Sequence, residues 1–213
     1  MKRFLLAVAV LLSSVTLTGC GKDTKKTEEK PKEEPKKEEK VESKFDINKY
    51  TKDVKKYELQ DTGKKHKVEV GYAKEAGYEE GEVVSNYMLK LENKKDTSKV
   101  QVEFFNTNLE KSLSVSKKEE KDFDANRIKN YKKLNINGKE GWEVFRVNST
   151  TQKIMSYEAQ LFLSDADEKG YTSAVKVTVN VNSTTDEGKN FDFEKYVKSD
   201  DFQYLLHSIK LAD

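Results

Sequence analysis

The sequence predicts an α+β fold: an antiparallel β-sheet with meander connections, flanked by two helices. Three observations support this prediction. Several stretches between residues 67 and 181 alternate apolar and polar side chains, which is typical of antiparallel strands with one buried and one wet face. Two links between these stretches have the chemistry of hairpin turns. The chain closes on an apolar stripe with helical spacing, which should lie on the sheet.

Period-two alternation places the strands. In residues 175–181, for example, every second side chain is a valine. Asn137-Gly138 predicts a tight hairpin, and residues 165–170 predict a looser one. The predicted strands are residues 67–72, 87–92, 100–104, 134–136, 142–147, 155–163 and 175–181.

The first predicted helix rests on a capping box. Ser116 and Glu119 have the spacing in which serine caps the helix and glutamate reaches back to it. We expect this helix to run to about Tyr131, with Phe123, Ile128 and Tyr131 facing inward.

The second helix is predicted to begin near Ser199, because Asp200 and Asp201 suit the positive end of a helix dipole. An apolar stripe at i, i+3, i+4 and i+7 follows, made of Phe202, Leu205, Leu206 and Ile209. Both helices are short, so tertiary burial must hold them.

This order of elements resembles the Mog1/PsbP-like fold, an antiparallel sheet flanked by helices. The resembling stretches are residues 131–147, with an Asn-Gly turn before an aromatic strand, and residues 193–211, which end in Leu-Leu-His-Ser-Ile-Lys. The family includes photosystem assembly factors, small-GTPase partners and bacterial surface lipoproteins, so the resemblance implies a shape and no activity.

The first residues have the pattern of a secretory signal. Lys2 and Arg3 give a positive start, residues 4–12 are all apolar, and residues 13–18 are mostly small. The apolar run is shorter than the roughly 20 residues that span a bilayer.

Leu17-Thr18-Gly19-Cys20 resembles the lipobox of bacterial lipoproteins. The resemblance implies that residues 1–19 are removed, with Leu17, Thr18 and Gly19 as recognition positions, and that Cys20 is acylated. Cys20 is the only cysteine in the chain, and a lone free thiol is unusual in a secreted protein. We therefore expect a lipid anchor on Cys20 at the extracytoplasmic face of the cell membrane, held by more than one acyl chain.

Residues 20–44 are predicted to be a charged, disordered linker. The stretch after Cys20 holds nine lysines and eight acidic residues, contains both prolines of the chain, Pro31 and Pro35, and has no aromatic residue. It has too little apolar surface to offset the entropy of ordering. Residues 45–213 are long enough for one globular domain with its own core.

Charge excludes one class of partner. The chain has 40 Lys plus Arg and 38 Asp plus Glu, and removal of Lys2 and Arg3 would leave the two signs equal. Nucleic-acid binding requires a basic patch or stripe, so we expect no nucleic acid partner.

The search for catalytic and metal-binding motifs returns little. His66 and His207 are the only histidines, and neither has a carboxylate or cysteine partner at metal-site spacing. Residues 165–170 resemble the start of a calcium loop, but Lys169 and Lys176 stand where the fifth and twelfth loop positions need oxygen ligands. We predict no catalytic residues, metal or cofactor.

The aromatic residues allow two interpretations. Those on or near strands would either line a sugar or peptide groove or fill the core beside the valines, and the second is favoured because glycan platforms usually contain more tryptophan than Trp142 alone. The residues are Tyr72, Tyr78, Tyr87, Trp142, Tyr157 and Tyr171.

Three functions remain open. The leading hypothesis is a non-enzymatic binding or scaffolding lipoprotein of the cell envelope, with a protein or glycan partner. The alternative is a LolA-like carrier of lipid or another hydrophobic ligand, against which the polar row Lys176, Thr178 and Asn180 argues. The third is a cell-wall hydrolase that gathers some of Asp165, Asp167, Glu158 and His207 in a cleft.

Replacing the lipidated sulfur tests the anchor. The substitution Cys20→Ser should abolish incorporation of a labelled fatty acid and move the protein from the membrane fraction to the soluble fraction, because acyl chains supply the membrane affinity. Fractionation of cells that express either form measures this, and tight membrane retention of the serine variant would contradict the prediction.

Overall fold

The computed structural model describes residues 41–42, 45–61, 66–113 and 128–212. The predictions about the signal, the lipobox, nearly all of the linker and the helix start at Ser116 lie outside these residues. The described residues all belong to one compact unit.

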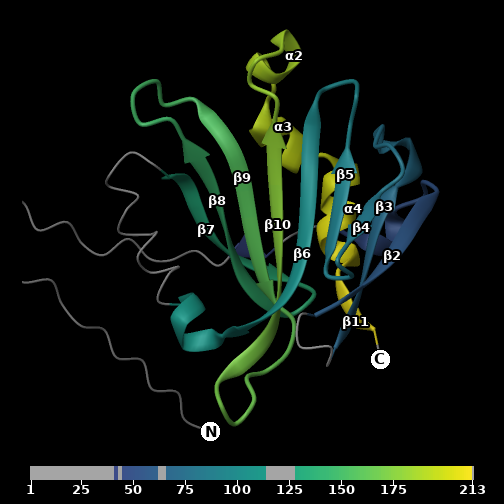
Figure 1. Ribbon diagram of the computed structural model, residues 1–213, viewed down its shortest axis with the longest axis vertical. Helices are drawn as coiled ribbons and strands as arrows, with labels where there is room; N and C mark the ends of the chain where they lie inside the picture. The colour runs from purple at the N-terminus through teal and green to yellow at the C-terminus, as the bar shows by residue number, and fades with distance from the viewer. Residues whose placement is uncertain (1–40, 43–44, 62–65, 114–127, 213) are drawn as a thin grey trace, which may run out of the picture. The chain divides into compact units, whose positions relative to one another are not determined.

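Eight strands form the larger, strongly curved sheet, in the order β1-β7-β8-β9-β10-β6-β5-β4 (Figure 1). All neighbours pair antiparallel except β1 and β7, which are parallel. In this order the strands are β1 (Val41–Glu42), β7 (Ile128–Ile136), β8 (Lys139–Val147), β9 (Ile154–Phe162), β10 (Tyr171–Val181), β6 (Ser98–Asn108), β5 (Met88–Glu92) and β4 (Glu82–Val84).

A smaller antiparallel sheet has the order β11-β3-β2, with strands β11 (Lys210–Ala212), β3 (Lys67–Ala73) and β2 (Val54–Gln60). Two short 3-10 helices, η1 (Ile47–Lys49) and η2 (Lys74–Ala76), flank β2 and β3 in the chain. The α-helices are α2 (Asp186–Lys189), α3 (Phe193–Val197) and α4 (Asp200–Ser208), and residues 109–113 are also helical.

The α+β class with antiparallel sheets is confirmed, and each predicted strand range lies largely within an observed strand. The prediction of one meandering sheet is wrong in two respects. The larger sheet contains two meanders, β4 to β6 and β7 to β10, which join where β10 pairs with the earlier strand β6. The first predicted strand, β3, belongs to the smaller sheet, where it pairs with β2 and β11.

The first predicted helix is wrong over its last residues, because residues 128–131 belong to β7. Ile128 and Tyr131 share a face, as the helical spacing suggested. In the structure they do so because the register with β8 shifts between Lys129 and Lys132. An extra residue in a strand changes its face, so a bulge and a helical turn give the same i, i+3 pattern.

Strand β1 falls within the segment predicted to be a linker. Val41 pairs with Leu134 and Glu42 with Asn135. These two residues therefore extend the larger sheet by a short parallel strand at the β7 edge.

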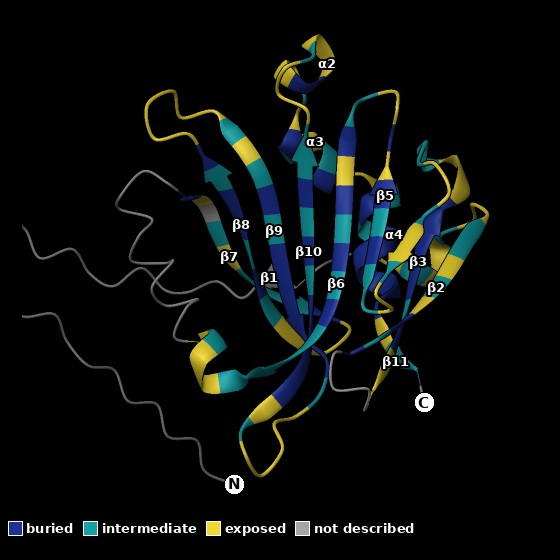
Figure 2. Ribbon diagram, in the orientation of Figure 1, coloured by how far each residue is buried: buried dark blue, intermediate teal, exposed yellow. Residues whose placement is uncertain are grey.

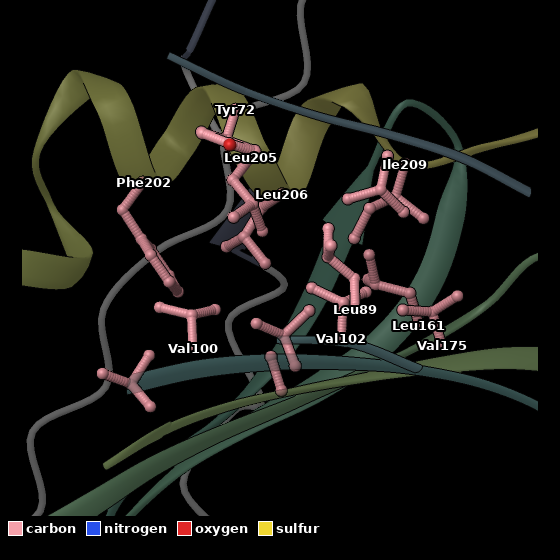
Figure 3. Packing of buried hydrophobic residues seen from close by; sticks show 14 of the residues in the cluster. Tyr72, Leu89, Val100, Val102, Leu161, Val175, Phe202, Leu205, Leu206 and Ile209 are labelled. Carbon is pink, nitrogen blue, oxygen red and sulfur yellow. The ribbon is translucent and has the colours of Figure 1, made fainter. Parts of the chain in front are cut away.

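Helix α4 forms as the sequence predicted and lies at the centre of the core. The Ser199 side chain accepts a hydrogen bond from the Phe202 backbone N–H at its N-terminus. Figure 3 shows Phe202, Leu205 and Leu206 on the side of the helix that faces the sheet residues Val100 and Val102. The whole predicted stripe, from Phe202 to Ile209, is buried in a cluster that joins both sheets.

A buried hydrogen-bond pair fastens α4 to the smaller sheet. The Ser208 hydroxyl accepts from the Gly71 N–H at 2.8 Å and lies 3.0 Å from the Gly71 carbonyl. A side chain at position 71 would press on the Tyr204 ring, whose atoms lie 3.2 Å from where its Cβ would stand. Glycine therefore lets the helix approach the strand closely.

The larger sheet also buries side chains on its other face, away from α4, which we call the outer face. Ile128, Trp142 and Val144 form a separate buried cluster there, against which Tyr131 packs. Figure 2 shows β9 and β10 as largely buried and the loop between them as mostly exposed.

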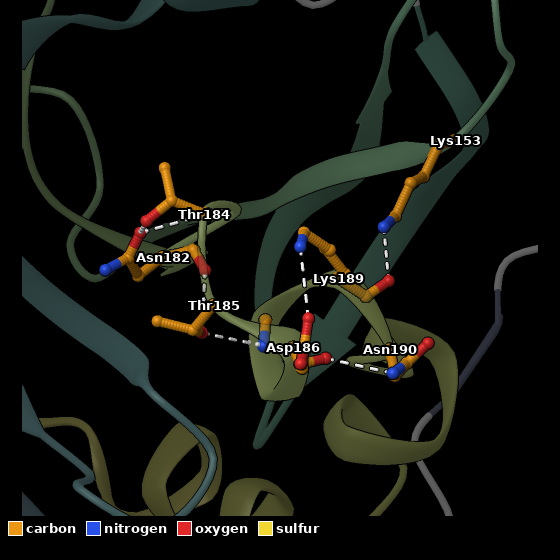
Figure 4. A network of polar contacts seen from close by, with 8 residues as sticks. Lys153, Asn182, Thr184, Thr185, Asp186, Lys189 and Asn190 are labelled. Atoms are coloured by element: carbon orange, nitrogen blue, oxygen red, sulfur yellow. Dashed lines mark hydrogen bonds and ion pairs between the residues drawn. The ribbon is translucent and has the colours of Figure 1, made fainter.

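One end of the sheet is closed by a polar network around α2 (Figure 4). Thr185 caps the helix by accepting from the Gly188 N–H, Lys189 pairs with Asp186 at 3.1 Å, and the Lys153 ammonium donates to the Lys189 carbonyl. These contacts tie the β8–β9 connection to the segment after β10.

Truncating α4 tests the core. Leu205→Ala should lower the free energy of unfolding by about 2–5 kcal/mol, because Leu205 is fully buried and the substitution leaves a cavity. Val83→Ala, at a site 37% exposed, is the matched control and should change it by less than about 0.5 kcal/mol. Urea titration measures both, and equal effects of the two substitutions would contradict this core.

Candidate functional site

The strongest candidate site is a cavity of about 620 Å³ on the outer face of β7, β8 and β9, called here the outer cavity. Its walls come from these strands, from the helical residues 109–113 and from the start of the β9–β10 loop. This volume lies in the range of small-molecule and short-peptide sites, roughly 300–1,000 Å³.

Most of the lining is apolar. Five apolar side chains come from three separate parts of the chain and are Leu109, Leu113, Trp142, Phe162 and Ala166. Leu134 also borders the cavity, but its side chain packs against the main core on the other face of the sheet. Leu113 lies at the rim and is 43% exposed, so solvent contacts an apolar side chain there. Ligand sites combine such walls with a few placed polar groups.

Gly141 lies in the strands that form the floor of the cavity, where the β8 and β9 backbones approach closely. Gly141 lines the cavity, and a Cβ at this position would overlap the Gln160 carbonyl oxygen across the β8–β9 ladder. A glycine within a strand marks such a close backbone approach. Any larger residue here would force β8 and β9 apart beneath the cavity.

The β7–β8 hairpin fixes the far wall. Asn137 and Gly138 have φ angles of 52° and 76°, as a type I′ turn requires, so the predicted tight hairpin is confirmed. The Asn137 side chain donates to the His207 carbonyl at the end of α4, at 2.9 Å. The turn that borders the cavity is therefore held by the helix on the opposite side of the sheet.

Two buried donors have no hydrogen-bond partner: Nε1 of Trp142, a residue that lines the cavity, and Nε2 of Gln160, which is not among the lining residues. The two residues stand directly opposite each other on β8 and β9 and are 5% and 7% exposed. A buried donor left unpaired costs about 1–3 kcal/mol. Such groups in a native fold suggest a function that supplies an acceptor.

Among the described residues that line the cavity, the charges balance. Lys133 and Lys139 contribute two cations, and Glu140 and Asp165 contribute two anions. An evenly charged rim selects no strongly ionic ligand, since a nearby excess of one sign is what attracts the other.

Of the four residues considered for a hydrolase, the structure brings together Asp165 and Asp167 and places the other two elsewhere. Asp165 borders the outer cavity and also shares a smaller pocket with Asp167 and His66. Asp167 closes its own loop by accepting from the Lys169 and Tyr171 N–H groups, both at 2.9 Å. In the calcium-like stretch, residues 165–170, the Asp167 carboxylate therefore stabilises the β9–β10 loop.

Glu158 and His207 lie elsewhere. Glu158 forms a bidentate pair with Arg146, at 2.6 Å from Nε and 2.8 Å from Nη2. His207 is buried on α4, where its ring centroid lies 5.1 Å from that of Phe45. Burial lowers the pKa of His207. His66 is exposed.

The aromatic residues divide between core and surface. Tyr72 and Tyr157 are buried in the main core, as expected, and Trp142 is buried in the outer cluster. Tyr78 and Tyr87 are half-buried. The expectation is wrong for Tyr171, which is 46% exposed because it ends the β9–β10 loop.

The polar row of β10 lies on the outer face, as predicted, and is half-buried. Lys176 in this row pairs with Glu103 of β6 at 3.1 Å. The row comprises Lys176, Thr178 and Asn180.

Within the described residues, no group of three or more His, Cys, Asp or Glu side chains could hold a metal ion. No helix in the same part of the chain is long and apolar enough to cross a membrane. The case for a binding site in the outer cavity therefore rests on its apolar lining and its unpaired hydrogen-bond donors.

Comparison with known proteins adds no family. No protein-family model matches the chain, and no curated protein sequence matches it. The arguments about function therefore rest on the residues themselves.

Sequence reasoning missed Gly141, Gln160 and Glu143. Gly141 comes directly before the predicted strand 142–147 and lies inside the observed strand β8. A glycine within a strand signals close backbone approach. Gln160 was one polar residue in an alternating row, and only the register with Trp142 gives it meaning.

Glu143 is the most unusual carboxylate among the described residues. It accepts from the Tyr157 hydroxyl at 2.8 Å and lies 3.9 Å from Lys132. Burial raises the pKa of Glu143, and the Tyr157 bond and the charges of Lys132 and Lys198 offset this only in part. The buried Tyr157 hydroxyl has its own pKa raised by burial and by Glu143.

Removing the Glu143 charge should change how stability depends on pH. A carboxyl whose pKa is raised by folding binds its proton more tightly when folded, so it costs stability as pH rises above its unfolded pKa. Glu143→Gln keeps an acceptor for Tyr157 and should raise the melting temperature at pH 7, with the gain shrinking toward pH 4. Thermal unfolding from pH 4 to 8 measures this, and a loss of stability at pH 7 would contradict it.

Proposed function

We propose that this protein is a lipid-anchored, non-enzymatic binding or scaffolding module of the cell envelope, with a Mog1/PsbP-like fold and the outer cavity as its binding site. The observation that carries the proposal is the unpaired Trp142 donor beside a largely apolar cavity. An apolar pocket with a few convergent polar groups is the default binding-site hypothesis for a fold.

The proposed location rests on the sequence. The lipobox-like residues 17–20 and the charged linker would attach the domain to the extracytoplasmic face of the membrane through Cys20. As a flexible coil, the 20 residues between Cys20 and β1 would reach about 25 Å, which would lift the domain clear of the lipid headgroups. The partner in this proposal is an envelope component.

The packing under α4 favours this proposal over a LolA-like carrier. A carrier needs apolar space between the sheet and its covering helix. Here that region is occupied by side chains that are almost fully buried, among them Phe202, Leu205 and Val102. The outer cavity lies on the opposite face of the sheet, outside this core.

A charge at the rim tests the binding role. Leu113→Asp should abolish capture of the envelope partner, since it places an anion on the exposed apolar rim of the cavity. Val83→Asp is the matched control, because Val83 is 37% exposed on β4, away from the cavity. Crosslinking in whole cells followed by quantitative mass spectrometry compares the two variants with the natural protein.

The outcome that supports the proposal is a set of crosslinked envelope components that persists in Val83→Asp and is lost in Leu113→Asp. Both variants should keep the natural melting temperature, since both positions are exposed. An identical crosslink pattern in all three proteins would exclude the outer cavity as the binding site.

A further inference from the structure

The unpaired donors indicate what the outer cavity recognises, and we infer that it binds an apolar peptide segment whose backbone carbonyls accept hydrogen bonds from Trp142 and Gln160. This inference rests on the proposed binding role of the cavity. It adds the chemical class of the ligand.

The first step is the polarity of the missing partner. The indole Nε1 of Trp142 can only donate, and Nε2 of Gln160 is the donor end of its amide. Both are buried without an acceptor, and the residues are cross-strand neighbours on one face. The ligand must therefore bring acceptors, and an amine or guanidinium ligand would leave both donors unpaired.

The second step is access to the two nitrogens. Water does not reach either of them in the ligand-free molecule, so solvent does not relieve the unpaired state. Trp142 lines the cavity, and Gln160 has a long side chain whose amide can rotate toward Trp142. Neither nitrogen is exposed and Gln160 is not among the lining residues, so an acceptor entering the cavity would reach the donors by turning the indole ring, and the Gln160 amide would follow.

The third step is charge. Two lysines and two carboxylates balance among the described lining residues, so these residues offer no net attraction for a fatty-acid carboxylate or a phosphate. A peptide backbone supplies acceptors without net charge. This favours a peptide over an ionic lipid.

The fourth step is shape. An extended peptide presents carbonyls at regular intervals and side chains on alternate sides. Its apolar side chains would cover Leu109, Phe162 and the exposed Leu113, while its carbonyls point at the strand floor. A volume of about 620 Å³ accepts a few residues.

Trp142 makes the experiment direct, because it is the only tryptophan in the chain. Its fluorescence is recorded on the full mature protein during titration with an acetylated and amidated Leu-Val-Phe-Ala tetrapeptide. Parallel titrations use a blocked Ser-Gly-Ser-Gly tetrapeptide, octanoate and octyl glucoside. The expected result is a saturable change in Trp142 emission with the apolar peptide alone.

A donor deletion then tests the hydrogen bond. Gln160→Met removes the amide at nearly constant length and should weaken binding of the apolar peptide by about threefold to tenfold. Gln101→Met is the matched control. Gln101 lies on β6 between the core residues Val100 and Val102, and so on the outer face, and its substitution should leave the affinity unchanged.

Several results would overturn the inference: an equal response to octanoate or octyl glucoside, no response to the apolar peptide, or full affinity in Gln160→Met. If the crosslinks depend on Leu113 but no tetrapeptide binds, the ligand class is wrong and the proposed function stands. If the crosslinks do not depend on Leu113 and no probe changes Trp142 emission, both fall.

Discussion

The packing of α4 between the two sheets is the constraint on which the rest of the described structure depends. Its apolar stripe is buried in a cluster that takes residues from both sheets. The Ser208 hydroxyl, just before β11 begins, accepts a hydrogen bond from the Gly71 N–H, where β11 no longer pairs with β3. The short helix gains its stability from this burial, since a helix of nine residues is marginal alone.

Because α4 and the core side chains fill one face of the curved sheet, a ligand would have to bind on the outer face. On the outer face, β8 and β9 approach closely at Gly141, and the hairpin at Asn137 is held from behind by the end of α4. The same helix therefore closes the core and fixes a wall of the outer cavity. The unpaired Trp142 and Gln160 nitrogens are the part of this arrangement that packing does not explain.

Much of the fold was predictable, because local patterns determine it. Alternating valines located β10, and capping and spacing located α4 to its first residue. The smaller sheet was not predictable, since β2 (Val54–Gln60) has no clear alternation and its pairing is set by distant residues. The bulge in β7 imitated a helical turn, so the local pattern there favoured the wrong element.

The candidate site was less predictable than the fold. From the sequence, Trp142 was recognised only as a buried aromatic residue, which is correct. That its indole nitrogen is unpaired and faces Gln160 of β9 is visible only in the structure. Asp165 was considered for calcium and hydrolysis, and the structure places it at the edge of an apolar cavity. A site formed by three separate parts of the chain becomes visible only when their register is known.

The central claim is that ligands bind on the outer face at Trp142 and not beneath α4. The most direct measurement is the ¹⁵N–¹H spectrum of the labelled protein, in which the single tryptophan gives one indole resonance. The account predicts a ligand-free indole signal at the position of an unbonded N–H, which moves downfield when an envelope ligand binds. An indole signal that stays fixed while amides of α4 shift would contradict it.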